Sequence, residues 1–339
     1  DESYYSEITP NSTRDPRSKW QATFPHEQVV KIFETLEKVL SRGRNEDKKN
    51  IWIDGAYGTG KSRILWTMKS LLDCPPQDLI AYFDSYDSLK NKTDLRDKFL
   101  AAKKRETVTV HRYATGGINS MQTLIRAVFD SVETELRRRN FKFNGAQTLR
   151  GKIAAWLEAD SANMQLFRAK IQKPDYRNST GLVNRSAEDI LADLKNPKMI
   201  VDTLIDDILT LGEKEGIRAF EIQMEDLKQW LAEVIDANNL KAVVFFWDEF
   251  SSFFKNHRNN LDEFQKLVEL STEKPFCMII ATQKAEDLLN ERDASFKTLR
   301  DRFIRREITM PDNIAFELIV DAFKIKSEAE TEWKIILPL

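Results

Sequence analysis

The sequence holds few residues of the kinds that staple small domains or ligate metals. Among 339 residues there are two cysteines, Cys74 and Cys277, and three histidines. The cysteines lie in unrelated contexts and match no metal-ligand spacing, so we expect no disulfide framework and predict a reducing, cytoplasmic compartment. The histidines, His26, His111 and His257, lie far apart in sequence and indicate neither a metal site nor a catalytic triad.

Long apolar runs and an excess of one charge are also missing. The longest apolar runs, such as Ala242–Trp247, are too short to cross a bilayer, and no charged-then-apolar leader opens the chain. The formal net charge is −2, which argues against wholesale coating of a nucleic acid but leaves room for a local basic patch. Because the chain begins at Asp1 and ends abruptly at Leu339, we expect a fragment of a longer polypeptide.

Strand and helix patterns alternate along much of the chain. Hydrophobic residues make up 41% and charged residues 31%, which predicts a packed core beneath a solvated surface. Short apolar segments predict strands at 50–54, 79–83, 108–113, 242–247, 276–281 and 307–310. Apolar residues at helical spacing predict helices at 26–40, 61–72, 121–136, 146–157, 200–211, 224–235, 261–270 and 315–323. This alternation is typical of an α/β fold with a mostly parallel sheet.

A glycine-rich turn follows the first predicted strand. It fits the pattern GxxxxGK[ST] at every defined position, with the residues Gly55, Ala56, Tyr57, Gly58, Thr59, Gly60, Lys61 and Ser62. Glycines let successive N–H groups point inward at phosphate oxygens, and the following helix presents its positive end to the same anion. We predict that Lys61 reaches the β- and γ-phosphates and that Ser62 ligates Mg²⁺. The strand before the turn and the helix after it favour this reading over a chance glycine-rich turn.

Two acidic residues follow the apolar strand at 242–247. A carboxylate at such a strand end can hold Mg²⁺ beside the phosphate loop, and we assign this role to Asp248. The adjacent carboxylate, Glu249, can orient and polarise the attacking water. Taken alone, the pair would indicate only a strand end and a cap for the next segment. The phosphate loop upstream favours the hydrolytic role, because a P-loop site needs such an acid.

Four segments, in this order, resemble the AAA+ superfamily of P-loop ATPases. They are the phosphate loop, the strand that ends in Asp248-Glu249, the strand at 278–283 and the stretch at 299–303. The resemblance covers roughly residues 24–323, less the helical middle, and implies ATP and Mg²⁺ as ligands in a homo-oligomer. It also implies that Gln283, where the family commonly has asparagine, senses the γ-phosphate with Thr282 as its neighbour. An ordinary polar strand end is the alternative.

The stretch at 299–303, Leu-Arg-Asp-Arg-Phe, is similar to the segment that carries the arginine finger in AAA+ rings. The resemblance implies that Arg302 acts on the nucleotide of a neighbouring subunit, where it neutralises charge on the transferred phosphoryl group. Arg305 and Arg306 are rivals for this role. The alternative is a basic helix end, where the positive charges interact favourably with the helix dipole. The helix at 315–323 would open the family's lid, but no convincing lid arginine follows it.

Three further patterns carry weaker signals. The tetrapeptide at 91–94, Asn-Lys-Thr-Asp, resembles the guanine-reading NKxD motif, but it precedes the acidic strand and no DxxG lies between it and the phosphate loop. We therefore predict adenine as the base. The segment at 24–26, Phe-Pro-His, lies where AAA+ proteins often flank adenine, although core packing is an equal interpretation. The segment at 137–143 mixes basic and aromatic residues, which suits a nucleic-acid strand or simply a helix end that favours cations.

The chain between the phosphate loop and the acids is much longer than a minimal P-loop core needs. We therefore predict an N-terminal arm and leading helix at 1–46, the first half of the ATPase core at 47–118, a helical insertion at 119–238, the second half of the core at 239–313 and the start of a lid at 314–339. The insertion is the expected place for recognition of a protein partner.

Together these patterns predict Mg-dependent ATP hydrolysis that drives or gates a conformational change in an oligomer. The alternatives are a nucleotide-operated signalling or assembly switch with slow turnover, and a loader or motor on nucleic acid. The intact Asp248-Glu249 pair favours hydrolysis over a pure switch. The tyrosine-containing phosphate loop and the large insertion also resemble ATPases of bacterial phage-defence systems, which implies a role in antiviral defence.

Overall fold

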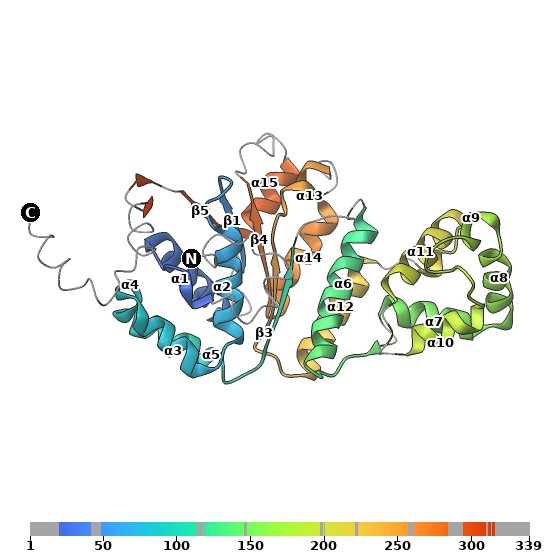
Figure 1. Cartoon of the computed structure of the whole chain (residues 1–339), viewed down its shortest axis with the longest axis horizontal. Helices are drawn as coiled ribbons and strands as arrows, with labels where there is room; N and C mark the ends of the chain where they lie inside the picture. The colour runs from blue at the N-terminus through green and yellow to red at the C-terminus, as the bar shows by residue number, and fades with distance from the viewer. Residues whose placement is uncertain are drawn as a thin grey trace, which may run out of the picture. The chain divides into compact units, whose positions relative to one another are not determined.

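The computed structural model describes residues 20–41, 49–113, 118, 120–145, 148–196, 199, 201–220, 223–256, 261–283, 294–309, 311–312 and 314–315. Within these ranges the chain forms an α/β fold around a five-stranded sheet (Figure 1). The strands are β1 Asn50–Gly55, β2 Thr107–Arg112, β3 Ala242–Trp247, β4 Phe276–Thr282 and β5 Phe303–Ile308. Every pairing is parallel, in the order β2-β3-β4-β1-β5. The predicted α/β class with a parallel sheet is confirmed.

Helices cover both faces of this sheet. Neighbouring residues of each strand point to opposite faces, so each strand contributes side chains to both layers. Ile51 and Ile53 of β1 pack into one cluster with α1 (Glu27–Ser41) and α2 (Lys61–Asp73). Trp52, between them, points the other way and stacks on Phe254 of α13 (Ser251–Asn256), with ring centroids 4.9 Å apart. Burial on both faces explains why β1, β3 and β4 consist of buried residues throughout.

The segment at 79–83 is helical, so the predicted strand there is wrong. It lies inside α3 (Pro76–Ser85), which has a proline in its first turn. Leu79, Tyr82 and Phe83 are buried whereas Ile80 is 37% exposed, which is the pattern of one helix face. So short an apolar run cannot distinguish a strand from a buried helix turn by periodicity alone.

The predicted strand at 307–310 is displaced in the structure. β5 begins at Phe303, because Phe303 to Ile308 pair in register with Asn50 to Gly55 of β1. Two consecutive arginines inside β5 conceal its strand pattern in the sequence. Met310 and residues 316–323 of the predicted lid helix lie outside the described residues, as do residues 1–19 of the predicted arm.

The remaining predicted helices are present, with boundaries that differ by a few residues. They are α1, α2, α6 Met121–Arg138, α7 Leu149–Ala159, α11 Asp202–Glu215, α12 Met224–Ala237 and α14 Asp262–Glu273. Helices that the sequence analysis did not predict are α3, α4 Asp87–Lys90, α5 Thr93–Ala102, α8 Ser161–Ile171, α9 Pro174–Arg177, α10 Ala187–Lys195, α13 and α15 Ala294–Asp301. None of the helices described is both long and apolar enough to cross a membrane.

The chain divides into two compact units. The sheet unit comprises Asp1–Gly116, Leu240–Leu261 and Val268–Leu339, and the helical unit comprises Gly117–Asn239 and Asp262–Leu267. The main segment of the helical unit thus occupies nearly the same residues as the predicted insertion at 119–238.

Two polar side chains of the helical unit, Arg150 and Ser186, bind the two ends of one helix. Arg150 of α7 is buried, and its guanidinium group donates hydrogen bonds to the backbone carbonyls of Asp193, Leu194 and Asn196 at 2.6–2.7 Å. These carbonyls belong to the C-terminal end of α10, where backbone acceptors lack helical partners. At the other end of α10, Ser186 forms a capping box.

Candidate nucleotide-binding site

The strand order brings three of the predicted segments to one edge of the sheet. Because all strands are parallel, their carboxyl ends lie at the same edge, and β4 lies between β1 and β3. Gly55 at the end of β1, Asp248 after β3 and Gln283 after β4 therefore meet there. Ligands of open α/β sheets bind at this edge.

Three glycines of the phosphate loop occupy positions where a larger residue would be unfavourable. Gly58 and Gly60 have φ angles of 81° and 84°, in the left-handed region that favours glycine. Gly55 meets a steric limit instead, because a Cβ atom there would lie 2.5 Å from the carbonyl oxygen of Ile308. The Thr59 hydroxyl donates to the Ala56 carbonyl at 2.9 Å and closes the turn from within.

Lys61 begins α2 and folds back over the phosphate loop. Its ammonium group donates to the carbonyl oxygens of Gly55 and Ala56 at 3.0 and 2.8 Å. No side chain in the described ranges caps the N-terminus of α2 at Gly60, and the first N–H groups of a helix are a favourable place for an anion. Burial lowers the pKa of Lys61, and the charges of nearby carboxylates, Glu249 first, oppose this shift.

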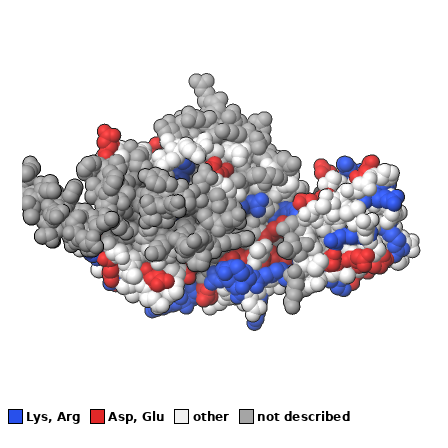
Figure 2. Space-filling model, viewed as in Figure 1, with Lys and Arg blue, Asp and Glu red and all other residues white. Residues whose placement is uncertain are grey.

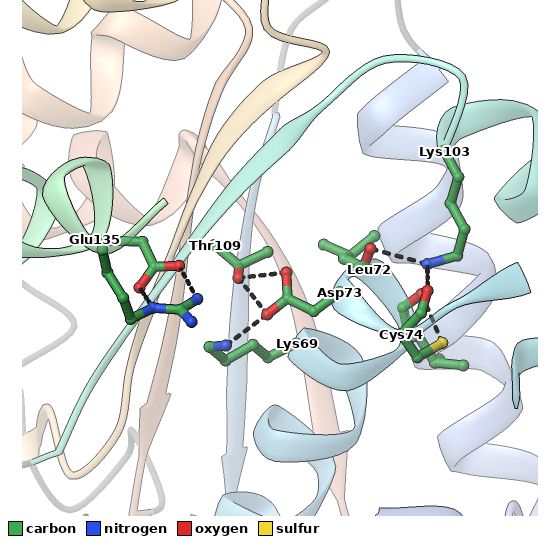
Figure 3. A network of polar contacts seen from close by, with 9 residues as sticks. Lys69, Leu72, Asp73, Cys74, Lys103, Thr109 and Glu135 are labelled. Atoms are coloured by element: carbon green, nitrogen blue, oxygen red, sulfur yellow. Dashed lines mark hydrogen bonds and ion pairs between the residues drawn. The ribbon is translucent and has the colours of Figure 1, made fainter. Parts of the chain in front are cut away.

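The other end of α2 is anchored to the sheet (Figure 3). Asp73, its last residue, accepts the Thr109 hydroxyl of β2 with its two carboxylate oxygens at 2.7 Å and pairs with Lys69 at 2.5 Å. Lys103 donates to the carbonyl of Cys74 at 2.7 Å, just beyond the helix. These contacts fix the axis of α2 and thereby the direction of its N-terminal end.

Asp248 is a buried carboxylate that is 1% exposed. Its Oδ1 accepts the backbone N–H of Glu249 at 2.8 Å. Burial raises the pKa of Asp248 above its ordinary value, although a hydrogen bond from the Ser62 side chain, the Glu249 amide and the charge of Lys61 all act in the opposite direction. Its Oδ2 is buried and has no hydrogen-bond partner in the described part of the chain.

These atoms fit a magnesium ion. A buried carboxylate oxygen without a partner is costly and rare in folded proteins, and both Asp248 Oδ2 and the Ser62 hydroxyl are the hard oxygen donors that Mg²⁺ prefers. Mg²⁺ usually keeps several waters and takes one or two protein oxygens beside substrate phosphates. It therefore needs no cluster of three His, Cys, Asp or Glu side chains, and the described residues contain no such cluster.

Glu249 has a strained backbone, with φ of 51°. This left-handed conformation costs a non-glycine residue roughly 1–2 kcal/mol and persists only where the surroundings enforce it. Hydrogen bonds hold the turn on both sides: the Asp248 N–H donates to the Arg112 carbonyl at 2.8 Å, and the Phe250 N–H donates to the Ala281 carbonyl at 2.9 Å. The Glu249 side chain is half-buried, and its charge acts on Lys61.

The two residues predicted at the end of β4 have different environments. The Thr282 hydroxyl is buried and accepts the indole N–H of Trp52 at 2.8 Å, which ties β4 to β1. Gln283 is exposed, and its backbone N–H donates to the hydroxyl of Ser251 at 2.8 Å. Of this pair, Gln283 has the exposed side chain, and its contact with a nucleotide stays a prediction.

Arg302 lies directly before β5, at the amino ends of the parallel strands and so opposite the ends that carry the phosphate loop. The six residues of β5 separate it from the phosphate-loop edge by roughly 20 Å, at about 3.3 Å per residue. Its guanidinium group pairs with Glu269 of α14 at 3.0 Å. Arg302 thus cannot reach the nucleotide of its own chain from this position, and its predicted action on a neighbouring subunit stays a prediction.

The rival arginines have partners inside the sheet unit. Arg305 donates through Nε and Nη2 to Oδ2 of Asp54 at 3.1 and 2.5 Å. Arg306 donates to the Thr35 hydroxyl at 2.8 Å. Sequence analysis missed Asp54, a fully buried acid just before the phosphate loop, whose Oδ1 has no hydrogen-bond partner among the described residues. An acid inside an apolar strand was the available signal.

The segment predicted to flank adenine lies along α2. Thr23, one residue before Phe24, bonds with the Thr67 hydroxyl at 2.7 Å and accepts a hydrogen bond from Arg63 at 3.0 Å. Phe24 is half-buried with its ring edge-on to Tyr86, 5.9 Å between centroids. This places the segment beside the first turns of the helix that follows the phosphate loop, and contact with adenine stays a prediction.

The guanine-like tetrapeptide has no place at the strand edge. Asn91 follows α4 directly and Thr93 begins α5, and all four side chains are exposed. Asp94 pairs with Lys98 of the same helix at 2.7 Å. These contacts match an ordinary surface turn and favour the chance interpretation.

The basic and aromatic side chains at 137–143 largely engage one another or nearby acids. Arg137 donates to Glu133 at 2.6 and 2.8 Å and lies over the ring of Phe143, 4.9 Å from its centroid. Arg139 lies over Phe141 at 5.1 Å. Figure 2 shows acidic groups beside basic ones on the visible face of the helical unit. These contacts add no support for a nucleic-acid surface.

Comparison with protein-family models gives no match, and no curated protein matches the chain.

Proposed function

We propose that this chain binds ATP with Mg²⁺ at the carboxyl edge of its sheet and hydrolyses it, as an AAA+-like P-loop ATPase that works in an oligomer. One observation carries the proposal: the phosphate loop and the acid after β3 converge, so that Ser62 and Lys61 both act to lower the pKa of Asp248, whose buried Oδ2 has no partner among the described residues. A chance glycine-rich turn has no reason to lie against a buried carboxylate of this kind.

The residues divide the work by position and charge. The N–H groups at the start of α2 and the Lys61 ammonium group bind the phosphates. Ser62 and Asp248 would hold Mg²⁺, which neutralises charge on the phosphates when it is bound. Glu249 orients and polarises the attacking water, and Gln283 contacts the γ-phosphate side of the site. Arg302 completes the site of an adjacent subunit.

Binding is tested by calorimetry with ATP and Mg²⁺ on Lys61→Ala and on a matched control, Lys90→Ala. Lys90 lies on the surface of the same unit in an exposed ion pair with Asp87, which contributes little. We expect Lys61→Ala to lose tight binding because the cation of the loop is gone, and Lys90→Ala to bind like the parent. Undiminished affinity in Lys61→Ala would remove this residue from the site.

Nucleotide choice and turnover are measured in parallel. ATP should outcompete GTP, and Asp94→Ala should leave this preference unchanged; a GTP preference lost in that variant would overturn the adenine assignment. Turnover and mass in solution are recorded with and without ATP. Assembly without turnover would favour the switch, and turnover only with DNA or RNA would favour the motor. We also propose a role in antiviral defence, and this role rests on the resemblance alone.

A further inference from the structure

Ser251 joins the end of β4 to the turn that carries Glu249. Its hydroxyl accepts the Gln283 N–H at 2.8 Å, and the residue is 5% exposed. One position earlier, the Phe250 N–H donates to the Ala281 carbonyl at 2.9 Å. The two hydrogen bonds run in opposite directions between the same two segments. They form a bridge between the end of β4 and the start of α13.

The bridge lies beside the strained residue of the site. The left-handed backbone of Glu249 persists only if neighbouring contacts over-determine it. On the far side of β4, Thr282 is fixed by the indole N–H of Trp52. Loss of the Ser251 hydroxyl would leave Thr282 anchored and release the amide of Gln283, so that any displacement falls on Gln283.

We infer that Ser251 is a positioning residue that sets the separation between the water-orienting Glu249 and the side chain of Gln283. The inference rests on the proposed ATP hydrolysis, because the two side chains need a fixed separation only if they act on one nucleotide. Ser251 contacts the backbone of Gln283 and works through it. Misplacement of reacting groups by about 1 Å can cost roughly 100-fold in rate, so a single hydroxyl in this place has a measurable effect.

The first test needs no nucleotide and measures the amide hydrogen exchange of Gln283 in the whole chain. Ser251→Ala should speed this exchange at least tenfold, because the N–H loses its acceptor, whereas Ser251→Thr should keep it slow. The melting temperature, compared with that of the parent, shows that the variant is folded. An unchanged exchange rate in a folded Ser251→Ala protein would show that the Ser251 hydroxyl does not hold the Gln283 amide, and would overturn the inference.

The second test is a double-mutant cycle in steady-state turnover. Ser251→Ala should lower kcat by about 10- to 100-fold with the KM for ATP nearly unchanged, and Ser251→Thr should restore kcat. The exposed neighbour Ser252 supplies the matched control, and Ser252→Ala should behave like the parent. In a Gln283→Ala background, Ser251→Ala should cause little further loss, because its effect passes through Gln283.

The outcomes separate the two proposals. Multiplying losses in the double variant would show that Ser251 acts independently of Gln283 and would overturn the inference while the ATPase stands. Absence of turnover in the parent would overturn the ATPase and with it the positioning role, and the exchange measurement would then report on the bridge as a structural contact only.

Discussion

The two units treat their buried polar groups differently. In the helical unit, Arg150 donates to three backbone carbonyls at the end of α10, and the half-buried Glu215 accepts from Lys173 and Tyr176 and pairs with Lys170. The Lys170 hydrogen bond, followed by that of Lys173, lowers the pKa of Glu215 to about 2. These polar side chains form hydrogen bonds and ion pairs within the unit, and the bonds link one helix to another.

At the carboxyl edge of the sheet unit, by contrast, buried polar groups stay incomplete. Asp248 and Asp54 each have a buried oxygen without a partner in the described residues, and Glu249 is strained. An unsatisfied buried group costs roughly 1–3 kcal/mol, so a ligand that completes it stabilises the fold. Buried atoms without a hydrogen-bond partner in the described residues also occur in both units away from the site, at His26, Trp66, His111 and Trp230. The difference teaches that an unmet polar group indicates a site where it lies beside a binding motif, as Asp248 does.

The largest effect should come from Arg302→Ala. If Arg302 acts on the nucleotide of an adjacent subunit, this variant should bind ATP nearly as well as the parent, while its turnover falls by up to roughly 10³–10⁵. Activity of the parent should also rise steeply with protein concentration, because an isolated protomer has an incomplete site. Steady-state turnover across a concentration series checks both expectations.

Mixing two inactive variants supplies the control for this prediction. Arg302→Ala and Glu249→Gln damage different halves of a shared site, so mixed oligomers contain some interfaces with both residues intact, and activity should return. If mixtures that co-assemble by mass stay inactive, the loss in Arg302→Ala comes from its ion pair with Glu269 and not from the site of a neighbouring subunit.

Glu249 allows activity and stability to be varied in opposite directions. Glu249→Gln keeps the shape but loses the basic oxygen, so turnover should fall at least roughly 100-fold with ATP binding retained. Glu249→Gly should be equally inactive yet more stable than the parent by up to about 1 kcal/mol, because glycine adopts the left-handed backbone without strain. Turnover and urea denaturation check the pair. A less stable glycine variant would contradict the strain argument.

Arg150→Ala is the matched experiment in the helical unit. Three carbonyls at the end of α10 lose a charged donor, so the free energy of unfolding should fall by about 1.5–3 kcal/mol. Basal ATP turnover per folded molecule should stay that of the parent. A large loss of turnover in a folded Arg150→Ala protein would break the comparison, since it would place part of the chemistry in the helical unit.

The most gradual effect concerns stability in acid, because it is spread over more than two pH units. Burial, and then the charge of Lys69, lowers the pKa of His111 to about 4 in the folded chain, from 6.5. The unfolded chain binds the proton more readily, so this contribution is fully present above pH 6.5 and is lost as the pH falls towards 4. The slope should stay below about 1.4 kcal/mol per pH unit. In denaturant titrations at several pH values, His111→Gln should flatten the slope. The lowered pKa of His26 should preserve part of it.

The sequence predicts some elements well because their patterns are local. β3 lies between two neighbours with both faces covered, so its apolar run matches the strand residue for residue. β5 is concealed because Arg305 and Arg306 find their partners, Asp54 and Thr35, far away in the sequence. A charge that is paired across the fold cannot be distinguished in sequence from one that faces solvent.

The same limit applies to the candidate site. The phosphate loop and the acids after β3 follow from residue types at fixed spacing. The strain at Glu249 and the bridge through Ser251 depend instead on hydrogen bonds to Ala281 and Gln283, some 30 residues away. No local pattern encodes contacts of this kind.

The position of β1 in the sheet has a consequence for synthesis on the ribosome. Its two neighbours are β4 and β5, and β4 begins about 220 residues after β1 ends. At about 5–20 residues per second, roughly 10–40 s pass before β1 can pair with either neighbour. Throughout this interval an apolar strand has two open edges, which is the geometry that recruits other chains into aggregates. A rearranged gene in which β4 and β5 are translated before β1 would shorten that exposure.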